Sequence, residues 1–148
     1  MELMGVYDEA LVEPLARVLA NLGVKKAMVV YGQDGLDEIS MSAQTTVCEV
    51  KDGEFLSYVI TPEQFGFTRC SKDELIGGRP QDNAQIALAI LKGEKGPRRD
   101  AVVLNSAAAI HIAKGISIED AIREAQEVIE SGKALAQLEQ FAALTNQE

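Results

Sequence analysis

The sequence has few basic residues and few cysteines, and each shortage excludes a class of protein. It contains 14 Lys and Arg against 23 Asp and Glu among 148 residues, a formal net charge of −9. Nucleic acids and anionic membranes bind proteins through basic surfaces, so we expect neither as a partner. The two cysteines, Cys48 and Cys70, stand far apart with no C-x-x-C motif, which excludes a disulfide scaffold and a structural zinc site.

Signals of several other classes are absent as well. No apolar run approaches the roughly 18 residues that a membrane span needs, and the first five residues lack the basic and apolar regions of a secretory signal. We therefore expect a cytoplasmic protein. Walker A and G-x-G-x-x-G motifs do not occur. The length and the 47% of hydrophobic residues suit a single globular domain over residues 1–148.

The apolar patterning predicts an α/β fold with a central mixed, partly parallel sheet flanked by helices. Residues 8–22 have helical periodicity after Asp8, a favourable N-cap, and residues 27–31 form an apolar run typical of a strand buried on both faces. Strands at 45–50 and 55–60 flank Asp52-Gly53, a hairpin signal. Helical segments are predicted at 61–64, 71–76, 83–92 (with Asp82 as cap), 98–114 and from 118 onward with a break at Ser131-Gly132.

The sheet built from these segments is incomplete. A strand buried on both faces needs neighbours on both of its edges, but the sequence supplies one hairpin and otherwise helices. This indicates a pairing or covering segment in another chain, and self-association is the corresponding expectation.

The residues richest in chemistry directly follow the strand at 27–31. Between Gly32 and Glu38, carboxylates stand at positions 34, 37 and 38 and a second glycine at position 35. Ligands of open α/β sheets bind beyond the carboxyl ends of strands, and Mg²⁺ commonly uses one or two carboxylates plus water and substrate phosphates. On chemistry alone an acidic surface turn or helix start is the more common case, and a metal site is the alternative.

Other candidate residues have a structural explanation that we favour over a functional one. Gly77-Gly78-Arg79 could cradle a phosphate but is typical of a helix C-cap. Arg98-Arg99 stands at a helix start, where cations are unfavourable; this indicates an anion partner or a nearby carboxylate, although a solvated helix start is favoured.

His111, the single histidine, is expected to pack rather than catalyse. Cys48 is expected in the core and Cys70 in a loop, with no clear activation of either. No catalytic residue is assigned.

The acidic segment and its surroundings resemble the anthranilate phosphoribosyltransferase family. Gly32-Gln33-Asp34-Gly35-Leu36-Asp37-Glu38-Ile39-Ser40 is similar to the family's Gly-x-Asp-Gly-Leu-Asp-Glu-hydrophobic-Ser segment. Further similar segments follow in the family's order at 61–66, 91–101 and 105–108, so the resemblance spans essentially the whole chain. It implies the C-terminal α/β domain of the nucleoside phosphorylase/phosphoribosyltransferase fold.

The family transfers a phosphoribosyl group from phosphoribosyl pyrophosphate to anthranilate, an early step of tryptophan biosynthesis. The resemblance implies that Asp37 and Glu38 hold Mg²⁺ against the pyrophosphate. The metal would neutralise charge on the leaving group. Other substrate-binding residues are not assigned.

The chain also departs from the family pattern. The family's Gly-Thr-Gly-Gly-Asp phosphate loop, its Lys-His-Gly-Asn segment and its anthranilate contacts are missing from these 148 residues, so the chain resembles the C-terminal part of the enzyme. We expect no transferase activity from it alone, and anthranilate binding only together with the missing N-terminal half. Within the match, Met41-Ser42-Ala43-Gln44 and Tyr31 differ from the usual residues.

Two other functions are alternatives. One is a fragment related to the pyrimidine nucleoside phosphorylases, which share the fold but handle phosphate and a nucleoside. The other is a non-catalytic domain that acts through self-association.

Overall fold

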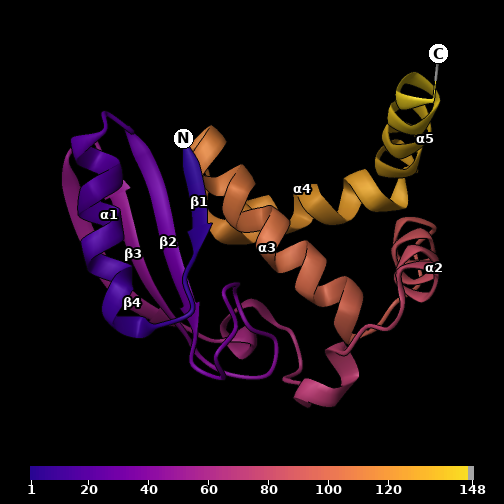
Figure 1. The fold of residues 1–148 in the computed structure, drawn as a ribbon, viewed down its shortest axis with the longest axis horizontal. Helices are drawn as coiled ribbons and strands as arrows, with labels where there is room; N and C mark the ends of the chain where they lie inside the picture. Colours follow the sequence, from indigo (N-terminus) through magenta and orange to yellow (C-terminus); the bar gives the residue numbers. More distant parts are fainter. Residues whose placement is uncertain (147–148) are drawn as a thin grey trace.

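The computed structural model describes residues 1–146, and these form a four-stranded mixed sheet with α-helices on both faces (Figure 1). The strands are β1 (Glu2–Gly5), β2 (Lys26–Gly32), β3 (Thr45–Lys51) and β4 (Glu54–Ile60). The α-helices are α1 (Val12–Asn21), α2 (Pro80–Leu91), α3 (Pro97–Lys114), α4 (Ile118–Glu130) and α5 (Lys133–Thr145). Short 3-10 helices are η1 (Glu9–Leu11), η2 (Pro62–Phe65) and η3 (Lys72–Leu75). The predicted α/β class with a partly parallel sheet is confirmed.

The strands lie side by side in the order of the sequence, β1-β2-β3-β4. β3 pairs antiparallel with both β2 and β4, whereas β1 pairs parallel with β2, from Glu2 beside Ala27 to Gly5 beside Val30. β1 is therefore the second neighbour that β2 requires, and the expectation that this neighbour comes from another chain is wrong. Four residues are too short a segment for alternation to reveal a strand, so β1 is defined by its pairing.

The hairpin predicted around Asp52-Gly53 is confirmed. Asp52 and Gly53 have φ of 49° and 88°, the positive values that a two-residue type I′ turn requires. This turn sets the register in which β3 and β4 pair, from Lys51 beside Glu54 to Thr45 beside Ile60.

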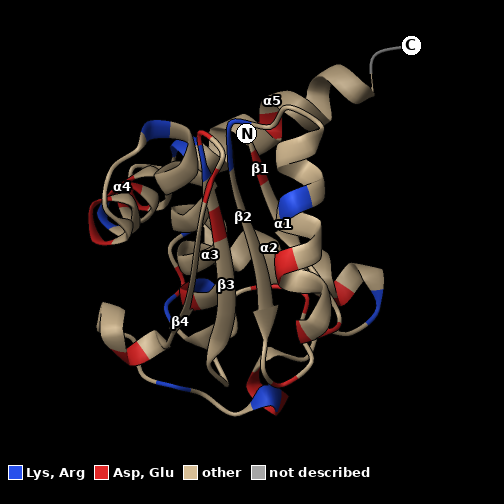
Figure 2. Ribbon diagram, turned by 90° about the vertical axis from the view of Figure 1, so that its left-hand side faces the viewer, with Lys and Arg blue, Asp and Glu red and all other residues tan. Residues whose placement is uncertain are grey.

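Successive residues of β2 face two different layers of the core. Ala27 and Val29 pack in the cluster formed with α1, while Met28 and Val30 pack in the cluster formed with α3 and α4. All four side chains are at most 1% exposed. Figure 1 shows α1 on one side of the sheet and α3 and α4 on the other, and in Figure 2 the charged residues lie mainly on helices and connecting loops. The continuous apolar run is the consequence of burial on both faces.

Two predicted helix starts differ from the structure: the helix predicted from residue 8 begins as the 3-10 helix η1, so that α1 itself begins at Val12, and the start of α2 also differs. α2 begins at Pro80, and Asp82 is not its cap but lies in the first turn, where its carboxylate accepts a hydrogen bond from the Arg79 backbone N–H at 3.1 Å. The predicted break at Ser131-Gly132 is confirmed: it divides two separate helices, α4 and α5, and Gly132 has a φ of 75°. Because a positive φ is accessible to glycine at low cost, the helix direction changes there.

No single helix within residues 1–146 is long and apolar enough to cross a membrane. Taken together, α3 and α4 pass the test of length and apolar composition, but the pair is bent by 117° between the two helices.

Candidate functional site

The acidic segment forms a tight loop at the carboxyl end of β2, where the sequence predicted a binding site. The Gly35 N–H donates to the carbonyl of Gly32 at 2.8 Å, and the Gly32 N–H donates to the carbonyl of Leu36 at 2.8 Å. Gly35 has a φ of 85°, a conformation that favours glycine. The loop therefore turns back on itself before it reaches Asp37 and Glu38.

Asp34 is turned into the loop and serves as its scaffold. Its carboxylate accepts hydrogen bonds from the hydroxyls of Ser40, at 3.0 Å, and Ser42. Burial by itself would raise the pKa of Asp34, but the hydrogen bonds from Ser42 and Ser40 outweigh it and hold the pKa below its ordinary value. Lys72 Nζ also donates to the Asp34 backbone carbonyl, at 2.7 Å. The Asp34 carboxylate therefore has a structural role in the loop.

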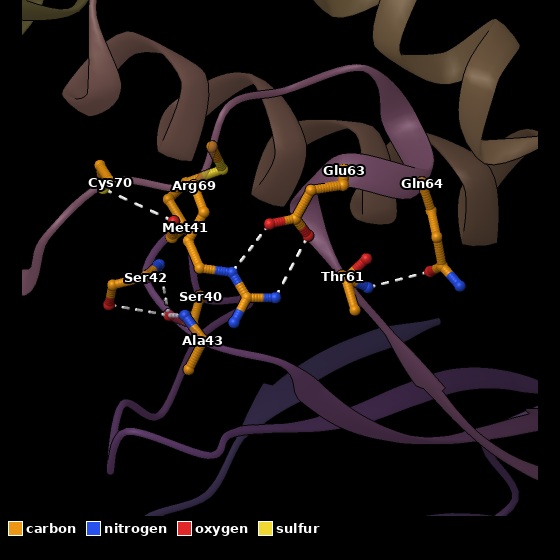
Figure 3. A network of polar contacts seen from close by, with 9 residues as sticks. All are labelled: Ser40, Met41, Ser42, Ala43, Thr61, Glu63, Gln64, Arg69 and Cys70. Carbon is orange, nitrogen blue, oxygen red and sulfur yellow. Dashed lines mark hydrogen bonds and ion pairs between the residues drawn. The ribbon is translucent and has the colours of Figure 1, made fainter.

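The Ser40 hydroxyl extends this scaffold into the next turn. It accepts the backbone N–H groups of Ser42 and Ala43 at 2.9 and 3.0 Å, as drawn in Figure 3. The backbone N–H of Cys70 donates to the carbonyl of Met41 at 3.0 Å. The stretch 41–44, which departs from the family pattern, therefore closes the loop and joins it to the segment after η2.

Asp37 and Glu38 have the opposite orientation, since both side chains are exposed. Neither carboxylate accepts a hydrogen bond or joins an ion pair within the described part of the chain. Both residues line a cavity of about 500 Å³ whose walls are mostly apolar side chains of α2 and α3, and a second hollow of about 410 Å³ beside α3 and the end of β1. The two predicted metal ligands are therefore adjacent, unengaged and open to a ligand.

Two contacts from distant parts of the chain hold the backbone of this pair. The carboxamide of Asn105, on α3, accepts the N–H of Ile39 at 2.9 Å and donates to the carbonyl of Ile39 at 2.9 Å. Gly5, at the end of β1, lies so close to Asp37 that a Cβ on it would be 1.5 Å from the Asp37 carbonyl oxygen. Asn105 lies within a segment similar to the family, but no local signal in the sequence indicates that Gly5 or Asn105 contacts the acidic pair.

The glycines at 77 and 78 are not a phosphate cradle in this structure. They accommodate Asn83, whose amide oxygen accepts the Gly78 N–H at 2.7 Å and would lie 2.4 Å from a Cβ on Gly77. The C-cap interpretation is also wrong, because η3 is capped at Ile76 and neither glycine has a positive φ.

The two arginines at the start of α3 have different surroundings. Arg98 donates to the carbonyl of Ile76 at 2.7 Å. Arg99 is only 5% exposed and pairs with Glu130 of α4 at 2.9 Å, so the expectation of a solvated helix start is wrong for it. The sequence left open that a nearby carboxylate compensates a cation at this helix start, and Glu130 is that carboxylate for Arg99. The ion pair connects α3 to α4.

His111 and the cysteines are structural, as predicted. His111 is partly buried, and its ring contacts the carbonyl of Ile116 and, at 3.4 Å, the carboxylate of Glu49. Cys48 is fully buried in β3. Burial and the charge of Glu74 raise the pKa of the Cys70 thiol, while the neighbouring Arg69 is engaged by Glu63 at 2.9 Å (Figure 3). The Cys70 thiol is therefore not activated.

Residues 1–135 match the family model described as glycosyl transferase family, a/b domain. The chain therefore belongs to this family of glycosyl transferases. Its relatives include the anthranilate phosphoribosyltransferase of Methanobrevibacter smithii, 60% identical over 147 residues, and that of Lachnoclostridium phytofermentans, 54% identical over 147 residues. In both cases the match covers 99% of this chain and 44% of the relative. The chain thus spans less than half the length of the curated relatives it matches.

Solved structures agree with this assignment. Anthranilate phosphoribosyltransferase from Thermus thermophilus has a TM-score of 0.85 and 38% identity, covering 94% of this chain and 41% of that one. The Saccharomyces cerevisiae enzyme in complex with PRPP and Mg has a TM-score of 0.85 and 28% identity, covering 95% of this chain and 41% of that one. The predicted family resemblance is confirmed, and the nucleoside phosphorylase alternative is not favoured.

Proposed function

We propose that this chain forms the part of an anthranilate phosphoribosyltransferase that binds phosphoribosyl pyrophosphate through Mg²⁺, with Asp37 and Glu38 as the protein ligands. The observation that carries the proposal is the exposure of these two adjacent carboxylates at a cavity, while the third carboxylate of the loop is hydrogen-bonded inside it. The names of the relatives and the complex of the yeast enzyme with PRPP and Mg support the same reading.

The donor set fits Mg²⁺ held together with a substrate. Among residues 1–146 no group of three or more His, Cys, Asp or Glu side chains is placed to hold a metal ion. Asp37 and Glu38 alone would leave most of the coordination shell to water and to phosphate oxygens, which is the usual state of Mg²⁺ in phosphate-handling enzymes. We therefore expect weak binding of Mg²⁺ alone and tighter binding with the pyrophosphate.

The two carboxylates also make metal and substrate binding interdependent. Phosphoribosyl pyrophosphate is an anion, so Asp37 and Glu38 would repel it if they faced it directly. When bound, Mg²⁺ supplies the positive charge that compensates both the carboxylates and the leaving pyrophosphate. The role of this chain's residues is to place two negative oxygens at a defined point beside the cavity.

Calorimetric titration tests the proposal. Phosphoribosyl pyrophosphate with Mg²⁺ is titrated into the wild-type chain and into the double variant Asp37→Ala, Glu38→Ala, and we expect binding only to the former. A control double variant, Glu127→Ala with Glu139→Ala, removes the same charge from exposed helical positions and should bind like the wild type. Equal binding to the first double variant, or none to the wild type, would contradict the proposal.

The proposal extends to the reaction as a whole. Residues 1–148 contain no glycine-rich phosphate loop and no anthranilate contacts, so by themselves they should not produce phosphoribosyl anthranilate. An assay at high protein concentration that detected this product would contradict this part. The resemblance further implies a place in tryptophan biosynthesis. The composition and length of the sequence favour a cytoplasmic setting and a single α/β domain over residues 1–148, and both belong to the proposal.

Association with another chain is a further part of the proposal. Phe141 and Leu144 on α5 are 62% and 67% exposed, and exposed apolar side chains favour contact with a partner or a second copy. Light scattering that found only a monomer over a wide concentration range would count against self-association.

A further inference from the structure

The backbone that carries the acidic pair has few anchors of its own. Asp37 and Glu38 lie in a stretch without helix or strand, and the next residue, Ile39, is 3% exposed. The N–H and carbonyl of a buried residue must be paired, or folding loses the hydrogen bonds that these groups make with water. For Ile39 these partners come from one side chain rather than from a strand.

That side chain is Asn105, in the middle of α3. Its amide oxygen accepts the Ile39 N–H and its amide nitrogen donates to the Ile39 carbonyl, both at 2.9 Å. The second amide hydrogen is available to the carbonyl of Ala101 one turn earlier, at 3.0 Å. The carboxamide is thus attached to its own helix and holds both sides of Ile39, as a neighbouring strand would.

We propose that Asn105 is a positioning residue for the carboxylate pair: it fixes the peptide that follows Glu38 and so sets where the Asp37 and Glu38 oxygens lie before any ligand binds. Asn105 itself lines the hollow of about 410 Å³ that both carboxylates border. Gly5 also restrains the pair through its close approach to the Asp37 carbonyl. A ligand site held in this way loses less conformational freedom on binding and therefore binds more tightly.

The inference rests on the proposed metal–pyrophosphate site, and its test separates the two. The variants are Asn105→Ala, which removes all three hydrogen bonds, and Asn105→Asp, which keeps the size and the acceptor but loses both donors. Val103→Ala is the matched control, because Val103 is a fully buried residue of the same helix that makes no hydrogen bond to the loop. Denaturant unfolding measures the free energy of unfolding of each of the three variants, so that a general loss of stability can be separated from an effect on the loop.

The first readout needs no ligand. Backbone amide hydrogen exchange, followed by NMR, should show a protected Ile39 N–H in the wild type, exchanging at least about tenfold faster in Asn105→Ala than in Val103→Ala after correction for global stability. The Asn105→Asp variant should keep this protection in part. Equal Ile39 protection in Asn105→Ala and Val103→Ala would overturn the inference.

The second readout is calorimetric titration of the Mg²⁺–phosphoribosyl pyrophosphate complex. Loss of an outer partner of a metal ligand typically weakens metal affinity about 10- to 100-fold, so both Asn105 variants should bind at least about tenfold more weakly than Val103→Ala. Unchanged affinity would overturn the inference while the proposed function stands. No binding by the wild type would overturn the proposed function and the inference with it.

Discussion

Two parts of one loop use the same chemical group for opposite purposes. Asp34, near its start, gives its carboxylate to the hydroxyls of Ser40 and Ser42, whereas Asp37 and Glu38, a few residues on, accept no hydrogen bond within the described residues. A carboxylate that accepts hydrogen bonds inside the protein stabilises the fold, and one that accepts none at the surface is available to a cation. The number of acidic residues in a segment is therefore a poor measure of its capacity to bind metal.

The two parts are also held by different devices. Side-chain hydroxyls six and eight positions away secure Asp34, so that anchor is local. The Asp37–Ile39 stretch is secured through its backbone by Gly5 and Asn105, which come from β1 and α3. A substitution in one set of contacts can therefore disrupt one part of the loop and leave the other part in place.

The largest effect is expected from Gly5→Ala. The added Cβ would lie 1.5 Å from the Asp37 carbonyl oxygen, so backbone must move, and overpacking of this kind costs about 3 kcal/mol of unfolding free energy. Gly35→Ala, in the same loop, is the control: its surroundings are open and only the φ of 85° is strained, which costs about 1 kcal/mol. Urea unfolding measures both, and equal losses would show that β1 does not confine the acidic pair.

An intermediate effect is expected from Asp34→Ala. The hydroxyls of Ser40 and Ser42 would lose the carboxylate that accepts their hydrogen bonds, and loss of a hydrogen bond to a charged group costs about 2 kcal/mol. Asp37→Ala, which removes an exposed and unpaired carboxylate, should change stability by less than about 0.5 kcal/mol. Urea unfolding of the pair at pH 7 tests the comparison, and similar losses in both variants would refute it.

The smallest effect is the pH dependence that Asp34 contributes to stability. Its pKa in the folded chain lies below the ordinary value of 3.8, so the ionised carboxylate stabilises the fold above pH 3.8, and this contribution is lost as the pH falls through the lower folded-state pKa. The stability gap between wild type and Asp34→Ala should therefore narrow below about pH 4. Unfolding curves of wild type and Asp34→Ala from about pH 7 down to about pH 2.5 measure it, and a gap that stays the same over this range would contradict the prediction.

Much of the fold was predictable because its signals are local. The Asp52-Gly53 turn, the apolar run of β2 and the cap at Asp8 each appear within a few consecutive residues. The missed elements depend on distant partners: β1 is a strand only because β2 lies beside it, and Arg99 is buried only because Glu130 reaches it from α4. No window of sequence contains both members of such a pair.

The candidate site divides in the same way. The sequence by itself determined that three carboxylates and two glycines follow a buried strand, because composition and periodicity are properties of neighbouring residues, and motif order along the chain was sufficient to indicate the family. Only the tertiary structure decided which carboxylates remain free. That choice depends on whether hydrogen-bond donors lie within about 3 Å of a carboxylate. The hydroxyls of Ser40 and Ser42 and the backbone contacts of Gly5 and Asn105 are in place only when the loop, β1 and α3 pack together.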